Sequence, residues 1–485
     1  MASLTKKLYY AKNGTDKTIK LYAAKSDCLD TTTGPFLNID LEGTIGYAGL
    51  VSGDGKGSYP SDMKVEYNGS TYTVQECGYH KITITQPSNG QIKITHNGST
   101  YNTSFDAMME GVYIVTATPN SGYKLTELKV DSTSISSGSS QTCSKAVTIT
   151  ATISAMTLSK YTGSISSLSY SPHGLAATNI GDYALFAGGY GSGGDTFSTV
   201  NAFNTSLTRS SPSGLSSTAS YLGATRVGNY ALFGGGYYYS ENTTARNNVS
   251  AYNESLTKTS PSSNLSTARS RLSAASIGSY AIFGGGSTTS SVVATVDAYN
   301  TSLTRSTPTA LSKARKNIAA ASTLNYAVFA GGQTRNGTGD SATDAYNASL
   351  TRSNPATELI SGSYSTSATV GDYILFCGSG TTVYAYNSSF TKSQLSSGLS
   401  GAGSGCAGTS IGNFAIFGGG ASGDTLKNTV TVYNASLTRS VPTALNTSRY
   451  QFAATSVGNF AIFGGGKTRT SNPTYTSATD AYIIS

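Results

Sequence analysis

The stretch GNYALFGGG at residues 228–236 decides the fold, because close copies of it recur along the chain. Each copy is an apolar run with a central phenylalanine, here Phe233, followed by small residues, and successive phenylalanines lie 41 to 50 residues apart. Internal repeats of this length indicate a protein built from repeated supersecondary units. The seven copies are GDYALFAGG (181–189), GNYALFGGG (228–236), GSYAIFGGG (278–286), LNYAVFAGG (324–332), GDYILFCGS (371–379), GNFAIFGGG (412–420) and GNFAIFGGG (458–466).

Shorter phrases surround each copy and complete the repeat. A run of small residues such as LSAAS (272–276) precedes it, and a tyrosine phrase such as VDAYN (296–300) follows it. A third phrase, SLTR at 302–305 for example, comes after the first six copies. Four short strands per repeat at this period are typical of propeller blades. We therefore expect an all-β chain whose larger part is a seven-bladed β-propeller.

The two ends of the repeat region predict how the ring closes. The seventh repeat stops at Ser485, where its fourth strand should begin. Leu158-Ser159-Lys160 lies 28 residues before Phe186, close to the 26 or 27 residues that separate the equivalent positions in the other repeats. We expect residues 158–168 to supply the outer strand of the last blade, so that residues 156–485 form one closed domain.

These repeats resemble those of kelch-type propellers. The apolar run ending in Phe233-Gly234-Gly235 and the tyrosine strand at 249–253 carry the resemblance, which covers roughly residues 158–485. The fourth strand departs from the family pattern, because it has Arg or Lys where kelch repeats usually carry Trp, and the chain contains no Trp. The resemblance implies a divergent, kelch-like seven-bladed propeller.

The N-terminal part reads as two small β domains, residues 1–76 and 77–155. The first contains two strand-turn-strand patterns, and VEYNGSTYTV at 65–74 resembles the end of small docking domains of phage virion proteins. The second resembles the Ig-like or internalin-type repeats of bacterial surface proteins and phage fibres, on ATPNSGY at 117–123 and VTITA at 147–151. These resemblances imply a docking domain and a spacer.

Composition divides the chain near residue 155. Residues 1–155 hold 13 Lys, no Arg and 13 acidic residues, whereas residues 156–485 hold 12 Arg, 7 Lys and 11 acidic residues, so the net charge of +8 lies in the repeats. The basic residues are spread in register with the repeat rather than concentrated, which predicts no nucleic-acid partner. The absence of a run of about 18 apolar residues predicts no membrane insertion, and the N-terminus lacks the apolar segment of a secretory signal.

Catalytic and metal-binding patterns are missing from the sequence. It holds no HExxH, P-loop or GxSxG motif, and its three histidines and five widely spaced cysteines predict no metal site, cofactor or disulfide framework. A kelch-type copper radical oxidase would need two histidines in the repeats, which hold only His173. We expect no enzyme, although a glycosidase stays open because its two carboxylates need not be close in sequence.

Two further patterns recur with the repeat and are interpreted as structural. Aspartates precede the Ala-Tyr of the third strand at positions 297, 344 and 480, and we expect them to pair with the Arg or Lys of the fourth strand. Six Asn-x-Ser triplets favour turns in which the asparagine side chain bonds to the backbone. These asparagines are Asn204, Asn253, Asn300, Asn347, Asn387 and Asn434.

The candidate ligand-binding residues lie in the loop between the second and third strands, whose length varies most. In the second repeat this loop departs from the pattern with three tyrosines in a row, and tyrosine rings stack on sugar faces while their hydroxyls form hydrogen bonds. The structural alternative is that these rings pack on a neighbouring loop or subunit. The candidates are Tyr190, Tyr237, Tyr238, Tyr239, Arg246, Arg335, Arg469 and Tyr475.

The leading hypothesis is a phage virion protein, a tail or head fibre, assembled in the cytoplasm of the bacterial host. Residues 1–76 would bind other virion proteins, and the propeller would bind a glycan or protein of the host surface. A homo-oligomer would suit a fibre, but no heptad segment supports one. The alternatives are a bacterial surface adhesin, a glycan-degrading enzyme and an intracellular kelch scaffold.

Overall fold

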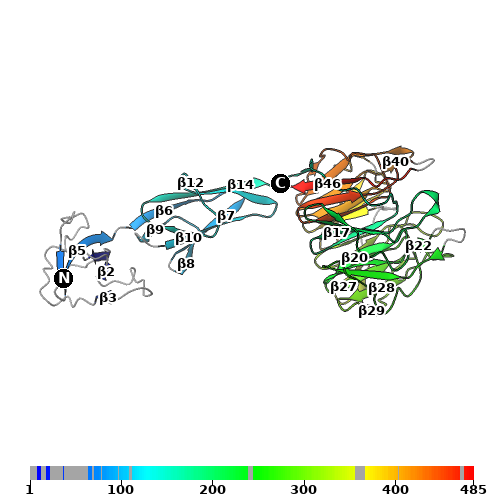
Figure 1. Ribbon diagram of the computed structural model, residues 1–485, viewed down its shortest axis with the longest axis horizontal. Coiled ribbons are helices and arrows are strands. Elements are labelled where there is room, and N and C mark those ends of the chain that lie inside the picture. The colour runs from blue at the N-terminus through cyan, green and yellow to red at the C-terminus, as the bar shows by residue number, and fades with distance from the viewer. Residues whose placement is uncertain are drawn as a thin grey trace. The chain divides into compact units, whose positions relative to one another are not determined.

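The chain is all-β and divides into two compact units, Met1–Ala155 and Met156–Ser485, each of which is treated by itself (Figure 1). The division falls at the composition step near residue 155. Among the described residues, no helix is long and apolar enough to cross a membrane. The computed structural model describes residues 8–12, 18–21, 36–37, 64–67, 70–77, 79–96, 98–108, 112–238, 244–355, 366–378, 380–401, 403–469 and 474–485.

The first unit begins with a sheet in the order β3-β2-β1-β5-β4. Antiparallel pairing of β1 with β2 and of β4 with β5 agrees with the two strand-turn-strand patterns of the sequence. The expected domain boundary at 76–77 falls at the end of β5. The strands are β1 (Leu8–Lys12), β2 (Thr18–Leu21), β3 (Phe36–Leu37), β4 (Lys64–Tyr67) and β5 (Ser70–Cys77).

Two further sheets of the first unit enclose one apolar core. Their orders are β13-β10-β7-β8 and β12-β11-β14-β6-β9, with β14 parallel to β6. In β10, Tyr113 and Val115 are buried while Val112 and Ile114 face outward, the alternation of a sheet with one covered face. The strands are β6 (Tyr79–Thr85), β7 (Gly90–His96), β8 (Ser99–Tyr101), β9 (Phe105–Met108), β10 (Val112–Pro119), β11 (Tyr123–Val130), β12 (Thr133–Ser134), β13 (Ser139–Thr142) and β14 (Val147–Ala155).

The second unit, called the seven-sheet unit below, contains seven antiparallel sheets of four strands. Sheet 1 is β16 (Ala176–Ile180), β17 (Tyr183–Ala187), β18 (Val200–Asn204) and β19 (Arg209–Ser210), and sheet 2 is β20 (Gly223–Val227), β21 (Tyr230–Gly234), β24 (Val249–Asn253) and β25 (Lys258–Thr259). Sheet 3 is β26 (Ser273–Ile277), β27 (Tyr280–Gly284), β28 (Val296–Asn300) and β29 (Arg305–Ser306), and sheet 4 is β30 (Ala319–Ser322), β31 (Ala327–Ala330), β32 (Thr343–Tyr346) and β33 (Arg352–Ser353). Sheet 5 is β34 (Thr366–Val370), β35 (Tyr373–Cys377), β36 (Val383–Tyr386) and β37 (Lys392–Gln394), and sheet 6 is β38 (Ala407–Ile411), β39 (Phe414–Gly418), β42 (Val430–Asn434) and β43 (Arg439–Ser440). Sheet 7 is β44 (Ala453–Val457), β45 (Phe460–Gly464), β46 (Thr479–Ile484) and β15 (Leu158–Lys160).

The seven sheets form a closed cycle. The first strand of each sheet contacts the first strand of the next, and β44 of sheet 7 contacts β16 of sheet 1. The second strands are buried on both faces, as their apolar sequence predicts. The position after the central phenylalanine must be small, since a Cβ on Gly464 of sheet 7 would lie 3.2 Å from the ring of Phe186 in sheet 1.

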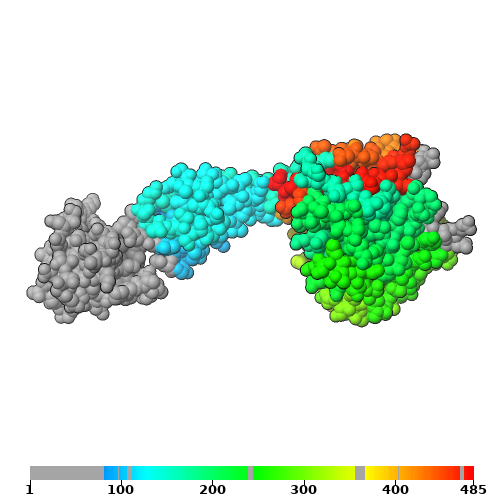
Figure 2. Space-filling view, in the orientation of Figure 1, coloured from blue at the N-terminus to red at the C-terminus, as the bar shows by residue number. Residues whose placement is uncertain are grey.

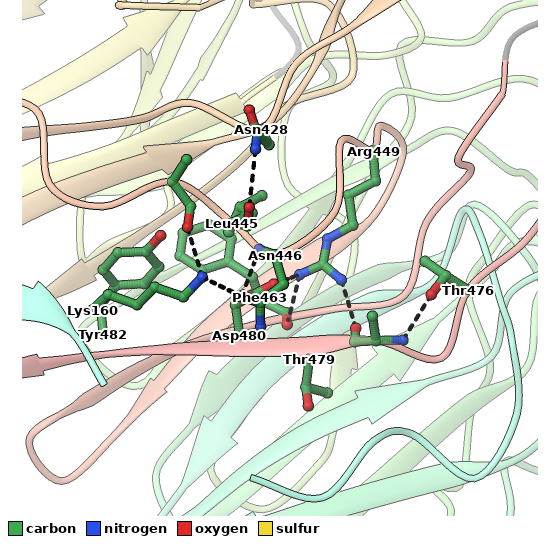
Figure 3. A network of polar contacts seen from close by, with 12 residues as sticks. Lys160, Asn428, Leu445, Asn446, Arg449, Phe463, Thr476, Thr479, Asp480 and Tyr482 are labelled. Atoms are coloured by element: carbon green, nitrogen blue, oxygen red, sulfur yellow. Dashed lines mark hydrogen bonds and ion pairs between the residues drawn. The ribbon is translucent and has the colours of Figure 1, made fainter. Parts of the chain in front are cut away.

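Sheet 7 is completed by the start of the seven-sheet unit. Leu158 pairs with Ile484 and Lys160 with Tyr482, so β15 is an antiparallel outer strand within the expected segment 158–168. Figure 2 shows the early residues of this unit lying beside its last residues. Lys160 also forms an ion pair of 3.0 Å with Asp480, whose other oxygen accepts a hydrogen bond of 2.8 Å from Arg449 (Figure 3).

The recurring aspartates pair with fourth-strand cations, as expected. Arg305 lies 2.9 Å from Asp297, and Arg352 lies 3.1 Å from Asp344. These arginine side chains are only about a quarter exposed, so they fold inward over the third strand rather than extending beyond the outer edge. All six Asn-x-Ser asparagines accept backbone N–H groups two and four residues later, which confirms the turn interpretation.

Candidate functional site

The candidate site forms where the chain enters the first strand of each sheet. There one residue per described crossover has a positive φ. In five of the six, its N–H donates to the carbonyl of the equivalent residue in the preceding sheet, as in Tyr221 to Gly174 over 2.7 Å and Arg271 to Tyr221 over 2.8 Å. We call the end of the seven-sheet unit that carries these residues the mouth face. The positive-φ residues are Gly174, Tyr221, Arg271, Asn317, Gly405 and Gln451.

The loop after each second strand turns back to the same face. In six of the seven sheets it starts with a Gly-Gly pair at positive φ, for example 72° at Gly235 and 97° at Gly236, which explains the recurring glycines. The residue after the pair forms two backbone hydrogen bonds with the crossover, as Tyr237 does with Ser220 and Tyr190 with His173. The loops proposed for recognition therefore share a face with the crossovers.

Aromatic side chains of sheets 7, 1 and 2 gather on the mouth face. The His173 ring stacks on Tyr475 at 4.9 Å and meets Tyr190 edge-on at 5.1 Å and Tyr221 at 6.0 Å. Tyr221 in turn stacks on Tyr237 at 5.6 Å, with the two rings almost parallel. We call these five residues the aromatic cluster; it offers ring faces and edges of the kind that contact sugars.

Cations lie against aromatic rings of the mouth face. The Arg271 guanidinium is 5.4 Å from the centre of the Tyr221 ring, and Lys467 is 5.7 Å from that of Tyr450. Burial, together with the nearby charge of Lys467, lowers the pKa of His173 to about 4, so this imidazole is neutral at pH 7. Burial also raises the pKa of the Tyr221 hydroxyl, which therefore keeps its proton as a hydrogen-bond donor.

A cavity of about 410 Å³ opens beside the aromatic cluster, within the size range of small-molecule sites. Two polar pairs line it: the Tyr221 hydroxyl donates to Gln451 Oε1 over 3.3 Å, and Asn317 Nδ2 donates to Gln333 Oε1 over 2.8 Å. Leu175, Ile318 and Phe452 add apolar side chains to the wall, and Ser404 adds a hydroxyl. The lining residues are Gly174, Leu175, Tyr221, Asn317, Ile318, Gln333, Ser404, Gly405, Cys406, Gln451 and Phe452.

The structure brings only some of the predicted site residues together. Tyr190, Tyr237 and Tyr475 belong to the aromatic cluster. Tyr238 and Arg246 meet each other instead, with the guanidinium 5.3 Å from the ring centre, next to the hairpin of β22 (Tyr237–Tyr238) and β23 (Thr244–Ala245).

Of the three remaining predicted residues, the two arginines add no contact to the aromatic cluster. Arg335 and Arg469 are exposed, and no contact between either of them and the cluster is found among the described residues. Tyr239 lies outside the described residues.

Sequence reasoning missed the crossover half of the site, including His173, Tyr221, Asn317 and Gln451. A signal was present in the sequence. Each of these four residues lies at or next to the position two residues before the first strand of its sheet, and the repeats differ most in side-chain type there. No group of three or more His, Cys, Asp or Glu residues suited to a metal ion occurs in the part of the chain that is described.

Comparison with known proteins identifies one part of the chain. Residues 80–157 match the family described as divergent InlB B-repeat domain, so an internalin-type repeat is present there, where the sequence resemblance placed it. No curated protein sequence matches the chain. Among solved structures, that titled "Structure of YjhT" superposes with a TM-score of 0.45 and 10% identity, covering 66% of this chain and 99% of that one.

Proposed function

We propose that this chain is a receptor-binding protein that holds host-surface carbohydrate on its mouth face. The observation that carries the proposal is the aromatic cluster and the adjoining cavity, built by loops from several sheets at one end of a rigid scaffold. Loops on such scaffolds are where recognition residues concentrate. Ring faces next to amide side chains offer both the stacking and the hydrogen bonds that a sugar requires.

The scaffold itself is proposed to be a divergent, kelch-like seven-bladed β-propeller. Seven four-stranded sheets, their closed cycle of first strands and the donation of β15 to sheet 7 support this assignment. Pairing of the first strand with the last closes such a ring without a covalent bond. A ring of this kind positions loops from all its sheets around one axis, as the mouth face requires.

The first and last residues of the seven-sheet unit lie side by side. Thr157, just before β15, exchanges two backbone hydrogen bonds with Ser485, which follows β46. Strand β46 starts at Thr479, close in sequence to the mouth residue Tyr475, and runs away from the mouth face. The chain therefore enters the seven-sheet unit at the end opposite to the mouth face, and the B-repeat domain would act as a spacer.

We propose the virion of a phage as the location, with residues 1–76 docking to other virion proteins and with self-association as a further possibility to test. The order of a small β-rich docking part, a B-repeat spacer and a binding unit supports this assignment. A bacterial surface adhesin is the second candidate, and it is favoured by the internalin-type match at residues 80–157.

Binding rather than cleavage is the proposed activity. Glycoside hydrolysis uses two carboxyl groups on either side of the scissile bond. Among the described residues, the lining of the cavity includes neither Asp nor Glu, and the recurring Asp297 and Asp480 are fully buried in ion pairs. We therefore expect bound polysaccharide to keep its length.

The full chain, applied to immobilised glycans and to envelope fractions of candidate hosts, tests the proposal. We expect binding to at least one carbohydrate fraction, weakened by Tyr237→Ser and kept by Leu324→Ser. Leu324 is 94% exposed in the turn between β30 and β31, away from the mouth face, and serves as the control. Absence of binding to every fraction would contradict the proposal, and labelling of purified particles with an antibody would separate virion from cell surface.

A further inference from the structure

The mouth cavity has a hydrogen-bonding character of its own, because much of the backbone around it is already hydrogen-bonded. Where the crossover bond is described, the N–H of the positive-φ residue bonds to the preceding sheet, as in Gln451 to Gly405 over 2.7 Å and Gly174 to Gln451 over 3.0 Å. Side chains therefore supply most of the groups that can recognise a ligand in the cavity.

The polar side chains of the cavity are neutral and retain unused capacity. An amide carries two donors and two acceptor lone pairs, and the Asn317–Gln333 pair uses one donor of Asn317 and one lone pair of Gln333. The Tyr221–Gln451 pair uses the hydroxyl proton and one lone pair of the amide oxygen. Groups that both donate and accept, such as sugar hydroxyls, match what is left.

Charged side chains stand outside this cavity rather than in it. Among the described residues its lining holds no Lys, Arg, Asp or Glu. Arg271 lies on the ring of Tyr221 instead, and Lys467 lies on that of Tyr450. An anionic ligand moved from water into such a cavity would lose its hydration without gaining a direct counter-charge, which is costly.

Two glycines in the wall of the cavity also leave room for a sugar ring. On one side a Cβ at Gly174 would lie 3.0 Å from the Tyr221 ring, and on another a Cβ at Gly405 would lie 3.2 Å from the backbone nitrogen of Gln451. Glycine at these two places lets the neighbouring side chains lie against the wall and keeps the cavity open. Ile318 and Phe452 add apolar surface for the C–H face of a sugar.

We propose that the mouth cavity binds one neutral sugar residue, with Asn317–Gln333 and Tyr221–Gln451 as the pairs that contact its hydroxyl groups. The proposal rests on the carbohydrate-binding function argued above and narrows its ligand. The net positive charge of the repeats would favour acidic glycans, whereas the chemistry of the cavity selects an uncharged unit.

The test measures binding of the full chain to methyl glycosides of neutral hexoses, of N-acetylhexosamines and of uronic acids by calorimetry and ligand-observed NMR. We expect at least one uncharged glycoside to bind and the uronic acids not to bind. Gln451→Met removes one amide and should weaken that binding about tenfold, the equivalent of about one lost hydrogen bond. Gln394→Met, an exposed amide on β37, is the matched control and should leave binding unchanged.

The outcomes separate this inference from the broader function. Glycan binding that is restricted to uronic acids, or that Gln451→Met and Asn317→Leu both leave unchanged, would overturn the neutral-cavity proposal while carbohydrate binding stands. Binding to no glycan or envelope fraction would overturn both. Thermal unfolding of each variant, expected at a midpoint close to that of the parent, shows that lost binding is not lost folding.

Discussion

The buried pair of Arg269 and Asp297 in sheet 3 allows a sharp test of how the repeats are stabilised. Both side chains are fully buried, and Arg269 Nη1 lies 2.7 Å from Asp297 Oδ2. The carboxylate also accepts hydrogen bonds from the N–H of Ser266 over 3.1 Å and from Arg305 over 2.9 Å. Sheet 2 has Ala219 and Ser250 at the two equivalent positions and folds in the same way.

The substitution Asp297→Ser copies the sheet 2 acceptor but leaves Arg269 charged and buried. Ser250 accepts the N–H of Ser216 over 2.9 Å, so a serine hydroxyl in place of the carboxylate would keep the crossover bond. Removing one partner of a buried ion pair costs about 3–5 kcal/mol, because an uncompensated charge stays behind. We expect this single substitution to lower the free energy of unfolding by that amount.

The double substitution Arg269→Ala with Asp297→Ser should cost less than the single one. It removes the orphaned charge and reproduces the Ala219–Ser250 pair of sheet 2. What it loses is packing and the hydrogen bonds of Arg269 to the carbonyls of Thr267 and Phe283, which we put at about 2 kcal/mol. A second substitution that raises stability over the first is the signature of a compensated buried charge.

Thermal and guanidinium-induced unfolding of the full chain measure these differences, with circular dichroism at 25 °C to check the folded state. The reciprocal pair provides the control: Ala219→Arg alone should destabilise sheet 2, and adding Ser250→Asp should recover part of the loss. The reasoning is refuted if the double variant in sheet 3 is as unstable as Asp297→Ser or more so.

Three further predictions concern closure, the glycine turns and pH. Lys160→Met removes the ion pair to Asp480 and the hydrogen bonds to Ala444 and Asn446. Hydrogen exchange of the backbone amides in β15 and β46 should therefore become faster, while exchange in β27 of sheet 3 stays slow. Equal acceleration in sheet 7 and sheet 3 would argue against local opening at the closure. Gly285→Ala should lower the free energy of unfolding by about 2 kcal/mol, because the new Cβ would lie 2.6 Å from the carbonyl oxygen of Arg315. Gly193 has open space around it, so Gly193→Ala should lower the free energy of unfolding less in the same assay. The pKa of His173 is about 4 in the folded chain and 6.5 in the unfolded chain. Between these pH values the unfolded chain binds more protons, so the free energy of unfolding should fall as the pH drops from 6.5 to 4. His173→Gln should flatten that part of a curve of stability against pH.

The strands of the seven-sheet unit could be predicted from the sequence because their signals are local. The apolar run around Phe233 and its tyrosine partner strand recur at a nearly constant spacing, so each copy checks the others. The donation of β15 followed from the same register, since Leu158 stands where the third phrase of the repeat is expected. Only the regularity of the repeat was needed for these inferences.

The buried arginines could not be predicted in the same way. Arg269 lies in a stretch rich in Ser and Thr, a composition typical of exposed loops, and Arg449 lies in another. Both are fully buried in the structure because an aspartate of the third strand of the same sheet faces them. The partners are 28 and 31 residues apart in sequence, a separation at which composition carries no information about contact.

The polar positions of the core and those of the mouth face vary in different ways among the repeats. Arg269, Arg315 and Arg449 occur in the sheets that carry an Asp in the third strand. Where that residue is Ser250 or Thr431, the crossover position holds a small residue without charge. Such paired variation is expected when two groups must compensate each other in the core.

The positive-φ positions of the mouth face differ in side-chain type from sheet to sheet. They hold Gly174, Tyr221, Arg271, Asn317 and Gln451 on one backbone conformation and one pattern of hydrogen bonds. The conformation itself favours glycine, and side chains at positive φ carry a cost. The fold does not require a tyrosine, an arginine or an amide there, and the proposed role in recognition would explain why the positions are not all glycine. Replacing Tyr221, Asn317 or Gln451 should therefore change ligand binding more than it changes stability.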